Sequence, residues 1–298
     1  MRKFVFLLIF IFIASTAGHK EMNKNTLNSV NENTCSLSFY DVDAAHFKYY
    51  ENDSHIVYWY EWWYANLKGD ENIVVMFFTF GDLNNPLLSV IGAFAAFLNE
   101  NESVEKVVCY PFINYSLDYE RCNITIAGNR FYEENGIFYI RYATNDFSLF
   151  MKLFPKGKEF GNVSKLKEWQ WTAWYVAMPY GNGEAWIEWK GNKYHLKGKG
   201  YHDHNWGISK KHDFKWDWGE FGCNNFAIIY GIVKDEEKGG IHFVNDSIHI
   251  FIPYGKAKIE YLEWKKINGF SKPTKLHLYG VDKNISMDFY VELERAYI

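Results

Sequence analysis

The chain has 298 residues and a formal net charge of −4 at pH 7, so it lacks the strongly basic balance that favours binding to nucleic acid or to anionic lipid. Hydrophobic residues make up 48% of the sequence and charged residues 23%, which is the composition of a globular protein with a large core. Aromatic residues reach 20%. Because aromatic side chains favour strands and bury large areas, they indicate either a strand-rich fold with an aromatic core or a pocket for a large apolar ligand.

The N-terminal segment has the three parts of a secretory signal. Basic residues at 2–3 precede an apolar run at 4–13, and small residues follow at 15–17. We therefore predict a signal peptide over 1–17, a disordered leader over 18–34, and a secreted or extracytoplasmic protein. The apolar run is shorter than a membrane span requires, so we expect no stable membrane insertion.

Cysteines and glycosylation sequons fit an exported protein. The four cysteines, an even number, permit two disulfides with three possible connectivities, and none forms a C-x-x-C pair that would favour zinc. Cys109 and Cys122 lie near adjacent apolar runs, so we favour that pair. Seven N-x-S/T sequons predict a glycoprotein if the host attaches sugars: Asn52, Asn101, Asn114, Asn123, Asn162, Asn245 and Asn284.

Short apolar or alternating runs, separated by turn residues, follow one another along the chain. The dipeptides Asn182-Gly183 and Gly191-Asn192 are hairpin signals, and only residues 88–98 could equally form a short helix. The pattern predicts an all-β protein with the strand spacing of a barrel or sandwich. A Gly- and Lys-rich stretch at 155–166 predicts a boundary between two β domains, 35–160 and 165–298.

The first motif that could carry chemistry is YWYEWWY at residues 58–64. On a strand, Glu61 and Trp63 share one face, and aromatic side chains occupy both faces, which predicts burial on both sides. A carboxylate among indoles must be paired, hydrogen-bonded or protonated. Glu61 is therefore either a proton donor with a raised pKa or a structural carboxylate paired with a buried group, and we favour the second.

The second motif is GKGYHDHNWG at residues 198–207. In an extended segment His202, His204 and Trp206 share one face, and Tyr201, Asp203 and Asn205 share the other. No third ligand follows the two histidines at a familiar spacing, so we expect no metal. Two interpretations stay open: acid–base chemistry by either histidine, oriented by Asp203 or Glu61, and a buried structural network.

A third motif, WDWGE at residues 216–220, again combines tryptophans with an acid, and core packing explains it without a function. The sequence has no G-x-S-x-G, Walker, G-x-G-x-x-G or H-E-x-x-H motif. We therefore expect no nucleotide or metal cofactor.

These motifs occur in order along nearly all of the mature chain: EWWY at 61–64, YVAMPYGNG at 175–183, then the second and third motifs. Together they resemble the carotenoid 1,2-hydratase (hydroxyneurosporene synthase)/AttH-like family, which looks related to kievitone hydratase and to fungal decalin-forming Diels–Alderases. The resemblance implies two lipocalin-like (calycin-type) antiparallel β-barrels packed side by side, with an aromatic pocket at their junction. It also implies cofactor-free chemistry on a small apolar molecule of isoprenoid or polyketide type.

The resemblance also implies roles for residues. His204, Glu61 and Trp206 would be catalytic, Asp203 and Asn205 would hold the motif, and the substrate would contact a set of four side chains: Trp63, His202, Trp218 and Tyr230. Family hydratases use a further carboxylate on the next strand, but residues 226–233 offer Tyr230 and no acid. This departure leaves cyclisation or ligand binding open.

Three functions therefore compete. The first is an exported hydratase or cyclase acting on a lipophilic substrate, and the second is a non-catalytic lipocalin-like carrier of an apolar ligand. Both predict an enclosed cavity. The third, a secreted structural or glycan-contacting module, predicts an exposed tryptophan in a shallow groove.

Overall fold

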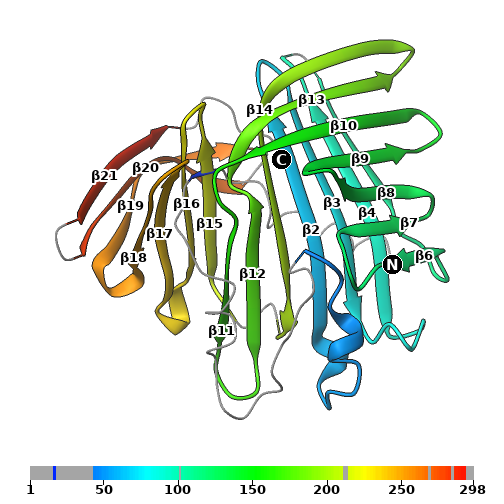
Figure 1. Cartoon of the computed structure of the whole chain (residues 1–298), viewed down its shortest axis with the longest axis horizontal. Coiled ribbons are helices and arrows are strands. Elements are labelled where there is room, and N and C mark those ends of the chain that lie inside the picture. Colours follow the sequence, from blue (N-terminus) through cyan, green and yellow to red (C-terminus); the bar gives the residue numbers. More distant parts are fainter. Residues whose placement is uncertain are drawn as a thin grey trace.

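The computed structural model describes residues 16–17, 43–100, 102–210, 214–267, 270–282 and 285–292. Strands make up almost all of its regular structure, so the all-β prediction is confirmed (Figure 1). Most of the predicted signal peptide, the whole leader, Cys35 and two sequons, Asn101 and Asn284, lie outside the described residues. In the described part, no helix is long and apolar enough to cross a membrane.

The largest sheet has thirteen strands. Its main order is β5-β4-β3-β2-β14-β13-β10-β9-β8-β7-β6, and β12 joins it by pairing with both β14 and β11. The bounds are β2 (Trp59–Lys68), β3 (Asn72–Gly81), β4 (Ser89–Leu98), β5 (Ser103–Val108), β6 (Tyr115–Leu117), β7 (Asn123–Ile126), β8 (Asn129–Glu134), β9 (Ile137–Ala143), β10 (Phe147–Lys156), β11 (Phe160–Lys165), β12 (Trp171–Met178), β13 (Tyr180–Trp189) and β14 (Asn192–Ile208).

Two smaller sheets follow along the chain (Figure 1). The five-stranded sheet has the order β1-β15-β16-β17-β18, with β1 (Thr16–Ala17), β15 (Trp216–Gly222), β16 (Phe226–Val233), β17 (Lys238–Asn245) and β18 (His249–Pro253). The three-stranded sheet contains β19 (Ala257–Ile267), β20 (Phe270–Asp282) and β21 (Ile285–Glu292). Short 3₁₀ turns complete the described elements: η2 (Phe47–Tyr49), η3 (Ile56–Tyr58), η5 (Lys234–Glu236) and η6 (Tyr254–Lys256).

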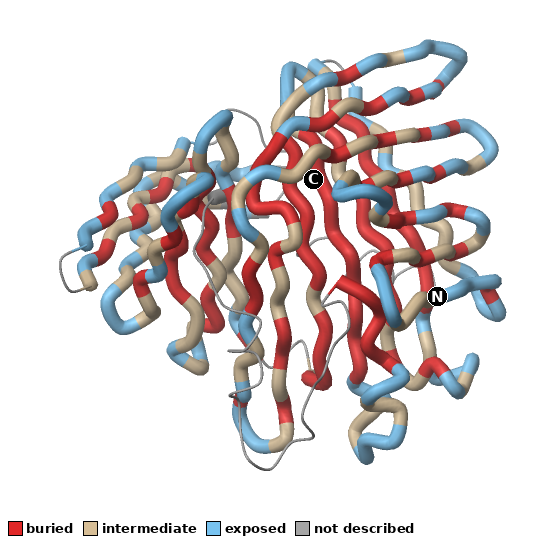
Figure 2. The backbone as a smooth tube through the Cα atoms, viewed as in Figure 1, coloured by how far each residue is buried: buried red, intermediate tan, exposed pale blue. Residues whose placement is uncertain are grey.

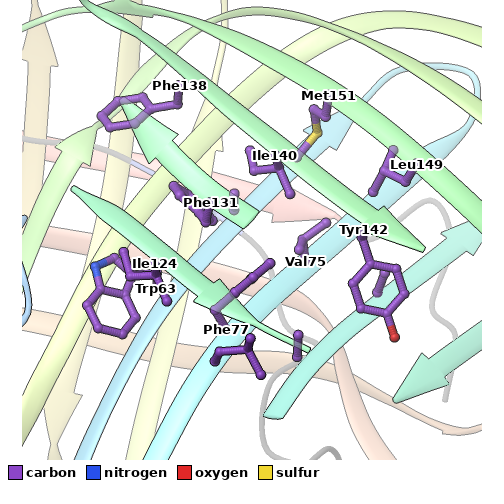
Figure 3. Packing of buried hydrophobic residues seen from close by; sticks show 14 of the residues in the cluster. Trp63, Val75, Phe77, Ile124, Phe131, Phe138, Ile140, Tyr142, Leu149 and Met151 are labelled. Carbon is purple, nitrogen blue, oxygen red and sulfur yellow. The ribbon is translucent and has the colours of Figure 1, made fainter. Parts of the chain in front are cut away.

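The large sheet curls on itself and encloses its own core. The rings of Phe77 on β3 and Phe131 on β8 lie 5.9 Å apart, although five strands separate β3 from β8 in the sheet order. Phe97 on β4 and Trp189 on β13 approach to 6.1 Å in the same way. The enclosed side is lined with fully buried aliphatic and aromatic side chains (Figures 2 and 3). Their transfer out of water is the main contribution that stabilises this half of the molecule.

The long strand β14 connects parts of the sheet that the sequence did not group together. Its first half pairs with β13, and its second half pairs with β2 on one side and β12 on the other. The predicted boundary coincides with β11, yet β12 to β14 continue the sheet that β2 begins. The large sheet therefore extends to Ile208, and the division into domains stays a prediction.

Two local predictions were wrong. Asn182-Gly183 lies inside β13, where a side chain at Gly183 would collide with Leu67 and Leu153, so this glycine allows close packing and makes no turn. The favoured disulfide is also wrong, because Cys109 and Cys122 are not bonded to each other. Cys122 packs into the enclosed core, whereas Cys109 packs on the other side of the sheet.

The structure also settles the conformation of residues 88–98 and the position of the predicted hairpin turn near Gly191. Residues 88–98 are strand β4 almost entirely, not a helix. The β13–β14 hairpin turns through Lys190 and Gly191, which both have positive φ, as a two-residue hairpin turn requires.

Candidate active site

Strands β2 and β14 bring the two sequence motifs together. They pair antiparallel, with Trp206 opposite Glu61 and His204 opposite Trp63. Directly paired residues share a face, and successive residues alternate between faces. Glu61, Trp63, His204 and Trp206 consequently all point into the enclosed core of the curled sheet, and His202 points there with them.

The centre of this site is a histidine between two carboxylates. His204 Nε2 lies 3.2 Å from Glu61 Oε1, and His204 Nδ1 lies 3.4 Å from Asp43 Oδ1. The side chains of His204 and Glu61 are completely buried, and that of Asp43 is 5% exposed. A buried charge is tolerated when it is paired in this way, because each partner replaces part of the solvation that the other loses.

The row of alternating histidines and carboxylates continues at both ends. His202 Nε2 lies 2.9 Å from Asp43 Oδ2, and its other ring nitrogen lies 2.8 Å from the carbonyl oxygen of Tyr64. The backbone N–H of His46 donates to Glu61 Oε1 at 2.6 Å, and His46 Nδ1 lies 3.2 Å from the same oxygen. The order is therefore His202, Asp43, His204, Glu61, His46.

The pKa values follow from this order. Burial by itself would lower the pKa of His204, but hydrogen bonds to Asp43 and Glu61 and their charges outweigh burial and raise it from 6.5 to about 9. Burial would raise the pKa of both carboxyls, yet the histidines hold the pKa of Asp43 well below its usual range and lower that of Glu61. For His46 burial dominates and lowers its pKa to about 4. At neutral pH, His204 is therefore a cation between two anions.

Aromatic rings enclose the histidines. The indole of Trp63 lies 4.5 Å from the His204 ring and nearly parallel to it, and Trp206 lies 4.8 Å away on another side. Trp206 also stacks on His46 at 3.9 Å. Phe131 contacts His202 at 4.7 Å. The row of histidines and carboxylates is thus embedded in apolar and aromatic surfaces.

Sequence reasoning missed Asp43 and His46. Both belong to residues 43–50, a segment before β2 that lies against the enclosed core and is here called the cover segment. Trp63 Nε1 donates to the carbonyl oxygen of Asp43 at 2.9 Å, and the N–H of Ala45 donates to that of Asp118 at 2.9 Å. The available signal was the run Asp-Ala-Ala-His, which places small apolar residues between an acid and a histidine just ahead of the EWWY motif.

Two groups of three residues could in principle hold a metal ion: His46, Glu61 and His204, and Asp43, Cys122 and His202. Ligand atoms within each group lie within 4.8 Å of one another. A histidine ligand must offer a lone pair to the metal, whereas both ring nitrogens of His204 face carboxylate oxygens. The donor atoms of the group that contains His204 therefore fit histidine–carboxylate pairs better than a metal centre.

Asp203 and Asn205 lie on the opposite face of β14. Asp203 Oδ2 accepts hydrogen bonds from Tyr201 at 2.7 Å and from Trp174 at 3.0 Å, and Oδ1 accepts one from Asn205 at 2.9 Å. Burial dominates over these bonds and raises the pKa of Asp203 to about 6. Asp203 consequently cannot orient either histidine, although the sequence allowed that role.

The remaining predicted residues also lie away from His204. Trp218 on β15 contacts Tyr64 at 5.6 Å and Tyr201 at 5.8 Å, so it belongs with Asp203 between the large and the five-stranded sheet. The Tyr230 hydroxyl donates to Asp217 at 3.3 Å, within the five-stranded sheet. The predicted residues therefore lie in three places. Some point into the enclosed core, Asp203, Asn205 and Trp218 lie on the opposite face of β14, and Tyr230 packs between the five-stranded and the three-stranded sheet. Two cavities found among the described residues, of about 670 and 260 Å³, are lined by none of these predicted residues.

No protein-family model matches the sequence, and no curated protein matches it. Solved structures do share its fold. An AttH-type protein from Nitrosomonas europaea superposes with a TM-score of 0.60 at 12% identity, covering 84% of this chain and 82% of that chain. Kievitone hydratase from Nectria haematococca gives a TM-score of 0.52 at 13% identity, covering 89% and 81%. The chain therefore has the lipocalin-like fold of the AttH-like proteins, as the resemblance of its motifs implied.

Proposed function

We propose that the protein is an exported, cofactor-free catalyst of the hydratase or cyclase type, which acts on a lipophilic molecule of isoprenoid or polyketide kind. The observation that carries this proposal is His204, a protonated imidazole held between Asp43 and Glu61 and surrounded by indole rings. Such a group holds a proton in an apolar setting, where a carbon–carbon double bond can be bound.

A residue of the site can be assigned to each step of hydration. His204 donates its proton to one carbon of the double bond, and the cation that forms on the other carbon is stabilised by the faces of Trp63 and Trp206. A water oxygen then bonds to the cation while its proton passes to Glu61. The second oxygen of Glu61, Oε2, has no hydrogen-bond partner among the described residues and can accept that proton. Transfer from Glu61 back to His204 restores the site, with one water added.

Substrate entry requires the cover segment to move, because it supplies Asp43 and His46 and closes the site. Withdrawal of Asp43 would also remove one of the two carboxylates that raise the pKa of His204. The imidazolium would then become a stronger acid at the moment when substrate enters. A cyclase would use the same steps, except that a second double bond attacks the cation and Glu61 takes a proton from carbon.

The fold gives independent support, because one of its solved representatives is named a hydratase. A non-catalytic carrier of an apolar ligand is the second candidate function. The complete burial of His202 and His204 in packed protein favours it.

Incubation of the purified protein with an apolar metabolite extract, followed by mass spectrometry, tests the proposal. We expect a metabolite to gain the mass of one water, and His204→Gln to slow that gain by at least about 100-fold, the lower range for loss of a general acid. The half-exposed His55 lies outside the site, so His55→Gln is the matched control and should retain activity. Recovery of a bound metabolite with unchanged mass would favour the carrier.

A further inference from the structure

The larger of the two cavities is a groove of about 670 Å³ on the outer face of the large sheet. Strands β9, β10, β13 and β14 supply its outward-facing side chains: Arg141, Ser148, Phe150, Trp186, Glu188, Lys193 and His195. The side chains that alternate with these, such as Tyr142, Leu149 and Ile187, are buried in the enclosed core. The groove and the candidate active site therefore lie on opposite faces of the sheet.

A row of near-parallel rings crosses this outer face. Tyr139 on β9 and Phe150 on β10 lie 6.4 Å apart, Phe150 and Trp186 on β13 lie 5.7 Å apart, and Trp186 and His195 on β14 lie 4.9 Å apart. Trp186 is 37% exposed, although tryptophan is among the side chains with the most to gain from burial. Core packing does not explain this row, because it faces away from the core.

Arg141 lines the groove at its β9 edge, and Arg130 on β8 lies beside the groove, where it lines the smaller cavity together with Glu133 and Glu134. Arg130 on β8 pairs in register with Arg141 on β9, an arrangement that destabilises a sheet when both side chains are charged. Arg130 lies over the ring of Tyr132 and bonds Asn123, and Arg141 lies over Phe150, but neither forms an ion pair with any described acid. The guanidinium of Arg141 in the groove, with that of Arg130 next to it and neither in an ion pair with a described acid, makes a place for an anionic group of a ligand.

The acids on β13 lie beside the aromatic rings, away from the arginines. Glu188 pairs with Lys193 at 3.3 Å, and Glu184 pairs with His195 at 3.2 Å and with Lys197 at 3.6 Å. The face thus changes along its length from unpaired cations, through aromatic rings, to polar groups that can donate and accept hydrogen bonds.

We propose that this groove binds an acidic oligosaccharide. Arg130 and Arg141 would bind a carboxylate or sulfate group, Phe150 and Trp186 would contact the apolar C–H surface of a sugar ring, and Ser148 and Glu188 would bond hydroxyl groups. A nucleic acid fits less well, because a regular polyanion would place phosphates beside Glu184 and Glu188, and the whole chain carries a charge of −4. An apolar ligand would leave both guanidiniums unmatched.

Calorimetric titration of the full-length protein at fixed ionic strength tests this site with four probes. They are an oligogalacturonate, its methyl-esterified neutral form, a sulfated oligosaccharide and a single-stranded oligonucleotide of matched charge. We expect the wild type to bind at least one of the two acidic sugars. Binding of the oligogalacturonate would show that the groove recognises carboxylate groups, and binding of the sulfated oligosaccharide would show that it recognises sulfate groups. Arg141→Gln and Trp186→Ala should each weaken that binding at least tenfold.

Trp264→Ala is the matched control, because Trp264 is 52% exposed and lies on β19, in a different sheet. It should bind like the wild type, and circular dichroism should show that all three variants are folded. Tighter binding of the oligonucleotide, equal binding of the neutral ester, or no binding of either acidic sugar would overturn the proposal. Hydration activity should be unchanged in Trp186→Ala, so the outcome here is independent of the proposed catalytic function.

Discussion

At the scale of single residues, the main feature is a buried cation between buried anions. Breaking such a row is costly, since removing one member leaves the others buried and uncompensated, at about 3–5 kcal/mol for a buried pair. His204 is the member on which both carboxylates depend. Its protonation state therefore links the stability of the fold to the chemistry of the site.

The stability of the protein should depend on pH through His204. Its folded pKa of about 9 lies above its unfolded value of 6.5, so its contribution is complete below pH 6.5 and is lost as pH rises through 9. A shift of this size corresponds to about 3 kcal/mol. Urea denaturation of the wild type should show the decline between these pH values, and His204→Gln should be much flatter there. An equally steep decline in the variant would assign it to other groups.

On the acidic side, the stability of the protein should depend on His46. Its folded pKa of about 4 lies below 6.5, so the unfolded state takes up a proton first and stability falls as pH drops from 6.5 towards 4. The lowered pKa values of Asp43 and Glu61 act in the same direction in acid. Maximum stability is thus expected near pH 6.5.

Much of this site could be predicted from single residues. Strand alternation placed the two histidines and Trp206 on one face and Asp203 on the other, and pairing of Glu61 with a buried histidine was one of the alternatives that its aromatic surroundings left open. The sequence could not give Asp43 or His46, because no local pattern tells which distant segment a buried histidine contacts. It also could not give the direction of the pKa of Glu61, which depends on partners that only the fold brings together.

At the scale of elements, the proposed entry of substrate depends on the cover segment. Short 3₁₀ turns and a few backbone bonds hold residues 43–50, in contrast to the continuous ladder of β2 and β14. Its anchor is electrostatic, since Asp43 bonds His202 and lies beside His204. Segments with few backbone bonds open at lower free energy than sheet strands.

Loss of the Asp43 charge should loosen this segment. In Asp43→Asn we expect amide hydrogen exchange to be faster in peptides covering 44–50, while peptides from the centre of β14 change far less. Asp53→Asn, at a half-exposed acid nearby, is the control. Unchanged exchange in residues 44–50 would show that the segment is held by packing and would remove the proposed route of entry.

Sequence patterns predicted individual strands but not how the strands pair in the sheet. Individual strands were recognisable from alternation and turn residues, and the hairpin at Lys190-Gly191 follows from backbone geometry. The pairing of β14 with β2 across the predicted boundary could not be recognised from the sequence. Strand pairing joins residues that are far apart in the chain, and the glycines of 155–166 carry no information about it. Gly183 was misread for a related reason, since a glycine needed for close packing looks like a turn glycine in a sequence.

At the scale of the whole molecule, polar contacts tie the large sheet to the five-stranded sheet. Lys68 on β2 forms an ion pair with Glu220 on β15, and Asn66 Nδ2 donates to the same Glu220 oxygen at 2.8 Å. Burial raises the pKa of Glu220, and Lys68 and Asn66 oppose that effect. Around them, Tyr64, Tyr201 and Trp218 supply the apolar part of the junction.

This ion pair should act as a unit. Glu220→Leu leaves Lys68 without its partner, and because the lysine is one-third exposed we expect a loss of only about 1–2 kcal/mol in urea denaturation. Adding Lys68→Met should restore most of that loss, since an apolar pair can replace a buried ion pair. A double variant whose loss equals or exceeds the sum of the two single losses would show that the pair does not couple the sheets.

For the whole molecule, the central proposal is that it adds water to its substrate with His204 as the proton donor. The direct measurement is the metabolite incubation in oxygen-18 water, comparing wild type, His204→Gln and His55→Gln by mass spectrometry. We predict one labelled oxygen in a product formed by the wild type and by His55→Gln, and almost none with His204→Gln. A ligand recovered without label from all three proteins, or labelling that persists in His204→Gln, would contradict it.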